Sequence, residues 1–141
     1  MIIHYNSSEF FWKETLLQSS LALKKEFPED SCAYIIGTLT QFKMNDEQAL
    51  AISLAQIQEN PIQKRSYLYR ELGDQALVQV GLFTDRVFDA NYFKMMGSLA
   101  YGNASILDRR YHLSSILENL SVHFNDWVEV LNLSSKIMGL S

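Results

Sequence analysis

The chain has 141 residues, of which 48% are hydrophobic and 20% are charged, with only two prolines and six glycines. These values are typical of one folded domain, here spanning residues 1–141, and exclude a disordered or low-complexity chain. The net charge of −4 argues against a nucleic-acid-binding protein, because such proteins usually carry a basic face.

The N-terminal half of the sequence predicts three helices, from about Ser8 to Phe27, from Pro28 to Thr40 and from Asn45 to Ile57. Apolar residues recur at helical spacing in each segment, and polar or acidic residues that favour a helix N-terminus open each one. Proline at position 28 suits the first turn of the second helix. The β-branched run from Tyr34 to Leu39 would also suit a strand, but its neighbours have the helical pattern.

The C-terminal half predicts four more helices, from Pro61 to Phe83, from Asp89 to Leu107, from Asp108 to Val122 and from Asn125 to Ile137. Either Asp89 or Asn91 would begin the second of these, and either Asn125 or Asp126 would cap the last. No segment shows the sustained alternation of polar and apolar residues that marks a half-buried strand. The sequence therefore predicts an all-α fold, a single-domain bundle of six or seven helices.

Small residues along two of these helices predict a tight helical hairpin at the centre of the fold. They recur every three or four positions, so each set occupies one helix face. The two sets are Gly73, Ala76 and Val80 on the first helix, and Gly97, Ala100 and Ala104 on the second. Small side chains let two helix backbones approach closely, so we expect both glycines to lie at close helix contacts.

Four residues are candidates for a polar site beside this hairpin: Tyr67, Arg70, Asp74 and Tyr101. Arg70 and Asp74 are four residues apart and therefore share a helix face. Asp74 also stands directly before an apolar run, and a buried carboxylate needs a partner to be tolerated. The simplest interpretation is a structural bond from Asp74 to Arg70 or to a tyrosine. The alternative is a small-molecule pocket with Tyr67 at its mouth.

Consecutive aromatic residues near the N-terminus predict an interaction surface. Phe10, Phe11 and Trp12 span about 200° of a helix circumference, because successive residues are about 100° apart. A single stripe facing the core cannot bury all three. We expect at least one of them to lie at an interface with a partner protein or a second copy, or in a groove between helices.

The sequence carries no signature of a metal, nucleotide or covalent catalytic site, so no cofactor and no catalytic residue are predicted. Its histidines do not form the Glu-x-x-His pairs of di-iron bundles. Asp108 and His112 could form an acid–base pair, but a capping aspartate and a partly exposed histidine are the simpler interpretation. The chain has neither a signal-peptide pattern nor a membrane-spanning apolar run, which predicts a cytoplasmic protein.

The stretch from Tyr67 to Ser105 resembles a pattern in uncharacterised helical bacterial proteins, in which a Leu-Gly-Asp and Gly-Leu-Phe helix is followed by Tyr, Gly and Ala-Tyr. The resemblance covers less than a third of the chain and implies a bacterial cytoplasmic helical domain with no established activity. The matching residues are Leu72, Gly73, Asp74, Leu77, Gly81, Leu82, Phe83, Tyr92, Gly97, Ala100 and Tyr101.

Two functions of different classes follow from these features. The first is a helical protein–protein interaction module, acting as an adaptor, an assembly subunit or a homodimer. It follows from the surplus of aromatic residues and the lack of catalytic signatures. The second is a small-molecule-binding protein or enzyme that uses the polar site around Asp74. The first would display an apolar surface, whereas the second needs an open cavity with convergent polar groups.

Overall fold

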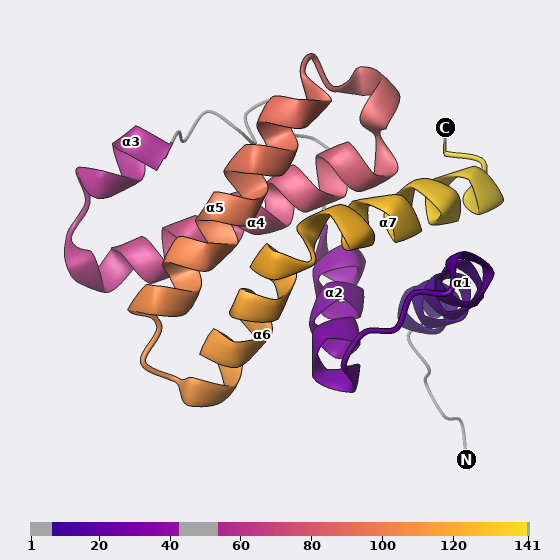
Figure 1. Ribbon diagram of the computed structural model, residues 1–141, viewed down its shortest axis with the longest axis horizontal. Coiled ribbons are helices and arrows are strands. Elements are labelled where there is room, and N and C mark those ends of the chain that lie inside the picture. The colour runs from indigo at the N-terminus through magenta and orange to yellow at the C-terminus, as the bar shows by residue number, and fades with distance from the viewer. Residues whose placement is uncertain (1–6, 43–53, 141) are drawn as a thin grey trace.

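Seven α-helices make up the computed structural model, which describes residues 7–42 and 54–140 (Figure 1). A single turn of 3₁₀ helix, η1, spans Thr84–Arg86, and no strand occurs in the described residues. The predicted all-α bundle of six or seven helices is therefore confirmed. The α-helices are α1 Ser7–Leu23, α2 Glu29–Gln41, α3 Leu54–Gln58, α4 Ile62–Leu82, α5 Ala90–Leu107, α6 Tyr111–Val122 and α7 Phe124–Met138.

Helix α4 lies at the centre, with α5 crossing it on one side and α7 packed along its C-terminal half (Figure 1). Helix α6 packs beside α5, while α1 packs on α7 and α2. This arrangement buries a continuous apolar core, to which α4 and α7 each contribute more side chains than any other described helix. The largest fully buried side chains on these two helices are Leu77, Val78, Val80, Phe124, Trp127 and Leu131.

The close contact predicted between the two small-residue helices is confirmed. A Cβ atom added to Gly73 would lie 2.6 Å from the ring of Tyr101, and one added to Gly97 would lie 3.0 Å from the Cβ of Ala76. The added Cβ of Gly97 would also overlap the ring of Phe124, which comes from α7. The hairpin of α4 and α5 therefore depends on glycine at both positions, because neither leaves room for a side chain.

The end of the first helix differs from the prediction, because α1 stops at Leu23 instead of continuing to Phe27. Lys24 adopts a left-handed conformation with φ of 55°, and the amide of Lys25 donates to the carbonyl of Ser20 at 2.9 Å. This pattern is a Schellman-type helix end. It releases Phe27 to stack on Trp127, with ring centroids 3.9 Å apart. Tertiary stacking thus outweighs continuation of the helix.

Substitutions at the two left-handed helix ends should change the free energy of unfolding in opposite directions. Lys24 carries a side chain at φ of 55°, whereas Gly139 ends α7 with φ of 74°. Since a Cβ is disfavoured in this conformation by about 1 kcal/mol, Lys24→Gly should raise the free energy of unfolding by up to that amount. Gly139→Ala should lower it by about 1 kcal/mol. Urea denaturation followed by circular dichroism measures both, and two changes of the same sign would contradict the interpretation.

The remaining boundaries agree with the predictions within a few residues. The side chain of Asp89 accepts a hydrogen bond from the amide of Tyr92 at 3.1 Å, which confirms Asp89 as the cap of α5. Helix α7 begins at Phe124, ahead of the expected Asn125 or Asp126 cap. The run from Tyr34 to Leu39 is helical, within α2. The predicted start of the third helix at Asn45 lies outside the described residues, which resume at position 54 with α3.

Candidate functional site

The polar side chains beside the hairpin form a cluster of one carboxylate and two tyrosines from three helices. The hydroxyl of Tyr101 on α5 donates to Asp74 Oδ1 on α4 at 2.7 Å. The hydroxyl of Tyr34 on α2 donates to the two oxygens of the same carboxylate, at 2.8 and 3.1 Å. Tyr101 is fully buried, and Tyr34 and Asp74 are half-buried. The predicted bond between Asp74 and a tyrosine is therefore confirmed, and it joins α2 to the central hairpin.

Burial determines the electrostatics of this cluster. Loss of hydration raises the pKa of Asp74 to about 6, although the hydroxyls of Tyr101 and Tyr34 and the nearby charge of Arg70 lower it. Desolvation and the facing carboxylate also raise the pKa of Tyr101 well above its ordinary value. Both tyrosines therefore stay protonated and donate to Asp74 throughout the neutral pH range.

The other two predicted site residues lie outside this cluster. The hydroxyl of Tyr67 donates to Glu71 Oε1 at 2.6 Å on the exposed side of α4. The guanidinium of Arg70 lies over the Tyr67 ring, 5.4 Å from its centroid. The structure thus brings Asp74 and Tyr101 together and leaves Tyr67 and Arg70 as a second, more exposed pair. The positive charge of Arg70 nevertheless lowers the pKa of Asp74.

Tyr34 is the member of the cluster that sequence reasoning did not identify. It lies 40 residues before Asp74 in the chain, and the sequence gives no spacing that relates the two. One local feature of the sequence could have identified Tyr34. Its hydroxyl is the only polar side-chain group in the run from Ala33 to Ile36. A tyrosine partly buried in such a run needs a hydrogen-bond partner.

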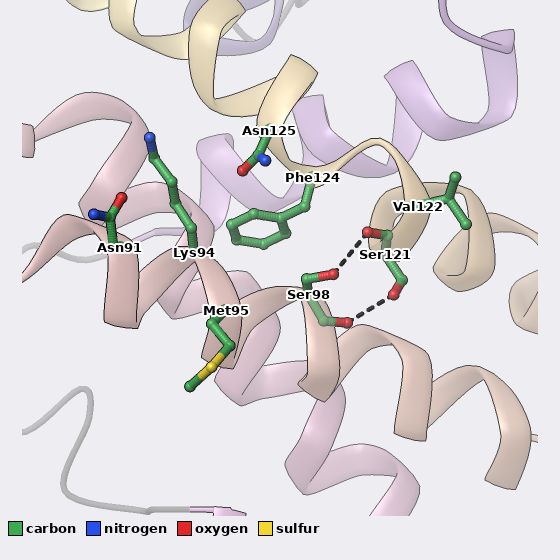
Figure 2. Close-up of a pocket in the computed structure, with 8 residues that line it drawn as sticks. All are labelled: Asn91, Lys94, Met95, Ser98, Ser121, Val122, Phe124 and Asn125. Carbon is green, nitrogen blue, oxygen red and sulfur yellow. Dashed lines mark hydrogen bonds between the residues drawn. The ribbon is translucent and has the colours of Figure 1, made fainter.

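Two hollows lie along the junction of α5 and α6, and neither is lined by Tyr67, Arg70, Asp74 or Tyr101. The first, of about 350 Å³, is shown in Figure 2. Its residues are Asn91, Lys94, Met95, Ser98, Ser121, Val122, Phe124 and Asn125. The second, of about 480 Å³, continues along the same junction and shares Ser121 and Val122 with the first. Together they form a groove that is open to solvent.

Paired serines hold the two walls of this groove together. Ser98 donates to the carbonyl of Ser121 at 2.8 Å, and Ser121 donates back to the carbonyl of Ser98 at 2.7 Å (Figure 2). Seven residues further along α5, Ser105 and Ser114 repeat the same exchange at 2.8 and 2.7 Å. These serines are bonded within the protein, so they fix the spacing of α5 and α6 and leave no free hydroxyl of their own for a substrate.

The aromatic residues predicted to form an interface divide between the core and the surface. Trp12 is 9% exposed and belongs to the core, so it is not part of the outward surface. Phe10 and Phe11 are 56% and 49% exposed. Leu17 and Leu21 lie seven and eleven residues after Phe10 and are exposed on the same side of α1. We call Phe10, Phe11, Leu17 and Leu21 the α1 outer face.

The described residues show neither a metal site nor a membrane span. No group of three His, Cys, Asp or Glu side chains within residues 7–42 and 54–140 is placed to hold a metal ion. None of the helices in these ranges is long and apolar enough to cross a bilayer.

Comparisons with family models, curated proteins and solved structures find no match to this chain. The resemblance to bacterial helical proteins and the cytoplasmic location therefore remain predictions.

Proposed function

We propose that this chain is a protein–protein interaction module and that it contacts its partner through the α1 outer face. The observation that supports the proposal is the distribution of apolar side chains around α1. Trp12 and Leu16 are buried against α2 and α7, whereas Phe10, Leu17 and Leu21 lie on the opposite side of the same helix in solvent. A helix with apolar residues on both sides is typical of a position between two packed layers.

The pattern also indicates the kind of partner. Phe10, Leu17 and Leu21 recur at intervals of seven and four residues, which is the spacing with which one helix packs along another. Leu21 is 71% exposed. Burying this leucine side chain against a partner would stabilise the complex by about 1.5–3 kcal/mol. We therefore propose a partner protein that presents an amphipathic helix to α1.

Photo-crosslinking in cells tests this proposal directly. A photoreactive phenylalanine analogue at Leu17 should form a discrete adduct with one protein, while the same analogue at Glu118, exposed on α6, should not. Phe10→Ser together with Leu21→Ser should abolish the adduct without changing the circular dichroism spectrum, because both side chains are exposed. The proposal would be overturned if the analogue at position 17 formed no adduct. It would also be overturned if the adduct still formed in the variant with both serine substitutions.

The small-molecule alternative stays a prediction. It requires a cavity at Asp74, and neither of the hollows beside α5 and α6 reaches that residue. The two tyrosine hydroxyls that face Asp74 are already bonded to its carboxylate. The observed geometry therefore favours a structural role for the cluster.

A further inference from the structure

The hollow shown in Figure 2 is lined by three polar side chains that the described residues leave without a partner. Asn91 and Lys94 rise from α5 and Asn125 from the start of α7, with the ring of Phe124 between the two helices (Figure 2). In the part of the chain that the structure describes, none of these three side chains makes a hydrogen bond or an ion pair. Amide and ammonium groups are hydrogen-bond donors, so three donors at one hollow are free to bind a ligand.

The charge of the hollow is positive. Lys94 is the single charged residue among the eight that line it, although acidic residues outnumber basic ones in the whole chain, 16 to 12. Lys94 is also half-buried, so solvent screens its charge less than that of a fully exposed lysine. The neighbouring hollow of 480 Å³ is instead lined by Asp108 and Glu118. A negatively charged group is therefore favoured at the first hollow and opposed further along the groove.

Apolar side chains beside Lys94 offer a surface to the rest of a ligand. Met95 and Val122 border the hollow and are 53% and 71% exposed, while the ring of Phe124 lines it from the core. Covering this apolar surface with a ligand removes it from water, which favours binding. The volume of about 350 Å³ lies at the lower end of the range of small-molecule pockets. The hollow therefore fits a small organic molecule better than a bare inorganic ion.

The hollow is already formed without a ligand. Ser98 and Ser121 exchange hydrogen bonds at 2.8 and 2.7 Å and thereby fix α5 against α6 along one wall (Figure 2). The ring of Phe124 is held in place beside Gly97, where an added Cβ atom would overlap it. A ligand would therefore bind without the cost of ordering these walls.

We propose that this hollow binds a small organic monoanion, in which one carboxylate is attached to an aliphatic or aromatic body. The ammonium group of Lys94 pairs with the carboxylate, and the side-chain amides of Asn91 and Asn125 donate to its oxygens. The apolar body lies against Met95 and Val122. One lysine balances the single charge of a carboxylate, whereas a phosphate group carries about two charges. The charge of the hollow therefore favours a carboxylate.

Nuclear magnetic resonance titration of the isotope-labelled chain with phenylacetate tests the proposal. We expect the side-chain amide signals of Asn91 and Asn125 to shift, with a dissociation constant on the order of 1–10 mM for a ligand of this size. Phenylacetamide keeps the ring but not the charge, and acetate keeps the charge but not the ring, so each should bind about tenfold more weakly. Absence of these shifts with phenylacetate would overturn the proposal. Equal binding of phenylacetate and either relative would overturn the assigned ligand class.

A matched pair of lysine variants locates the charge that binds phenylacetate. Lys94→Gln should weaken binding by about tenfold, because it removes the positive charge. Lys64→Gln on α4 is the control and should leave binding unchanged, because Lys64 is exposed and does not line the hollow. Binding that is unaffected by Lys94→Gln would overturn the site. The hollow lies on α5, α6 and α7, so the photo-adduct at the α1 outer face should persist in Lys94→Gln.

Discussion

Replacing Gly97 by leucine should lower the free energy of unfolding by about 1–3 kcal/mol or more, because the contact of α5 with α4 and α7 at this position has no space for a side chain. A Cβ at this position would overlap the buried ring of Phe124 and lie 3.0 Å from the Cβ of Ala76. Neither neighbour can move freely, because protein interiors are packed as densely as organic crystals. Relief of the overlap therefore requires α5 to separate from α4 and α7.

The control for this substitution is Gly37→Ala. Gly37 lies inside α2, and a Cβ added there would meet nothing within 4 Å. Because alanine favours helices more than glycine, Gly37→Ala should raise the free energy of unfolding by about 0.5–1 kcal/mol. Urea denaturation followed by circular dichroism gives both values. If Gly97→Leu proved as stable as the parent, the close contact at the centre of the hairpin would be contradicted.

The contact at Gly97 also shows which part of the fold could be predicted from the sequence. Helical periodicity and the alignment of Gly73 and Gly97 with small residues follow from local spacing, so the hairpin of α4 and α5 was predictable. The third partner at this contact was not. Phe124 comes from α7 and enters beside Gly97 only in the folded state. Local spacing carries no information about such a distant contact.

The same limit explains the errors at α1 and at the candidate site. Continuous helical spacing predicted that α1 would reach Phe27, but the stack of Phe27 on Trp127 requires the chain to leave the helix at Lys24. Similarly, Asp74 was identified from its position before an apolar run, whereas Tyr34 reaches it from another helix. Tyr101, which reaches Asp74 from the other helix of the predicted hairpin, was found. Tyr34 and Phe124 come from helices outside the hairpin and were missed.

The surface of α1 is an intermediate case. Three consecutive aromatic residues correctly indicated that one helix face could not bury them all, and Phe10 and Phe11 are exposed. Their sequence did not reveal that Trp12 would be the one in the core. The buried side of α1 is defined by its contacts with α2 and α7, which bury Trp12 and Leu16 together.

The stability of the chain should fall relative to that of the Asp74→Asn variant as the pH rises from about 4 to 7. Asp74 has a pKa of about 6 in the folded state, against an ordinary value of 3.8. Between these values the folded chain binds the proton more tightly than the unfolded chain, so the contribution is most favourable below pH 4 and is lost through pH 6. The expected loss is on the order of 3 kcal/mol, since one pKa unit corresponds to about 1.4 kcal/mol.

Urea denaturation of the parent and Asp74→Asn at several pH values measures this difference, because asparagine keeps an acceptor for the tyrosines but does not titrate. Asp126 is a control of opposite sign. Its hydrogen bond with Lys25, at 2.8 Å, lowers the pKa of the carboxyl group, so Asp126→Asn should remove stability that the parent has above about pH 4 and loses in acid. Parallel pH profiles for the parent and Asp74→Asn would show that the carboxylate is hydrated. The bonds from Tyr34 and Tyr101 would then add little to the packing of α2 on the central hairpin.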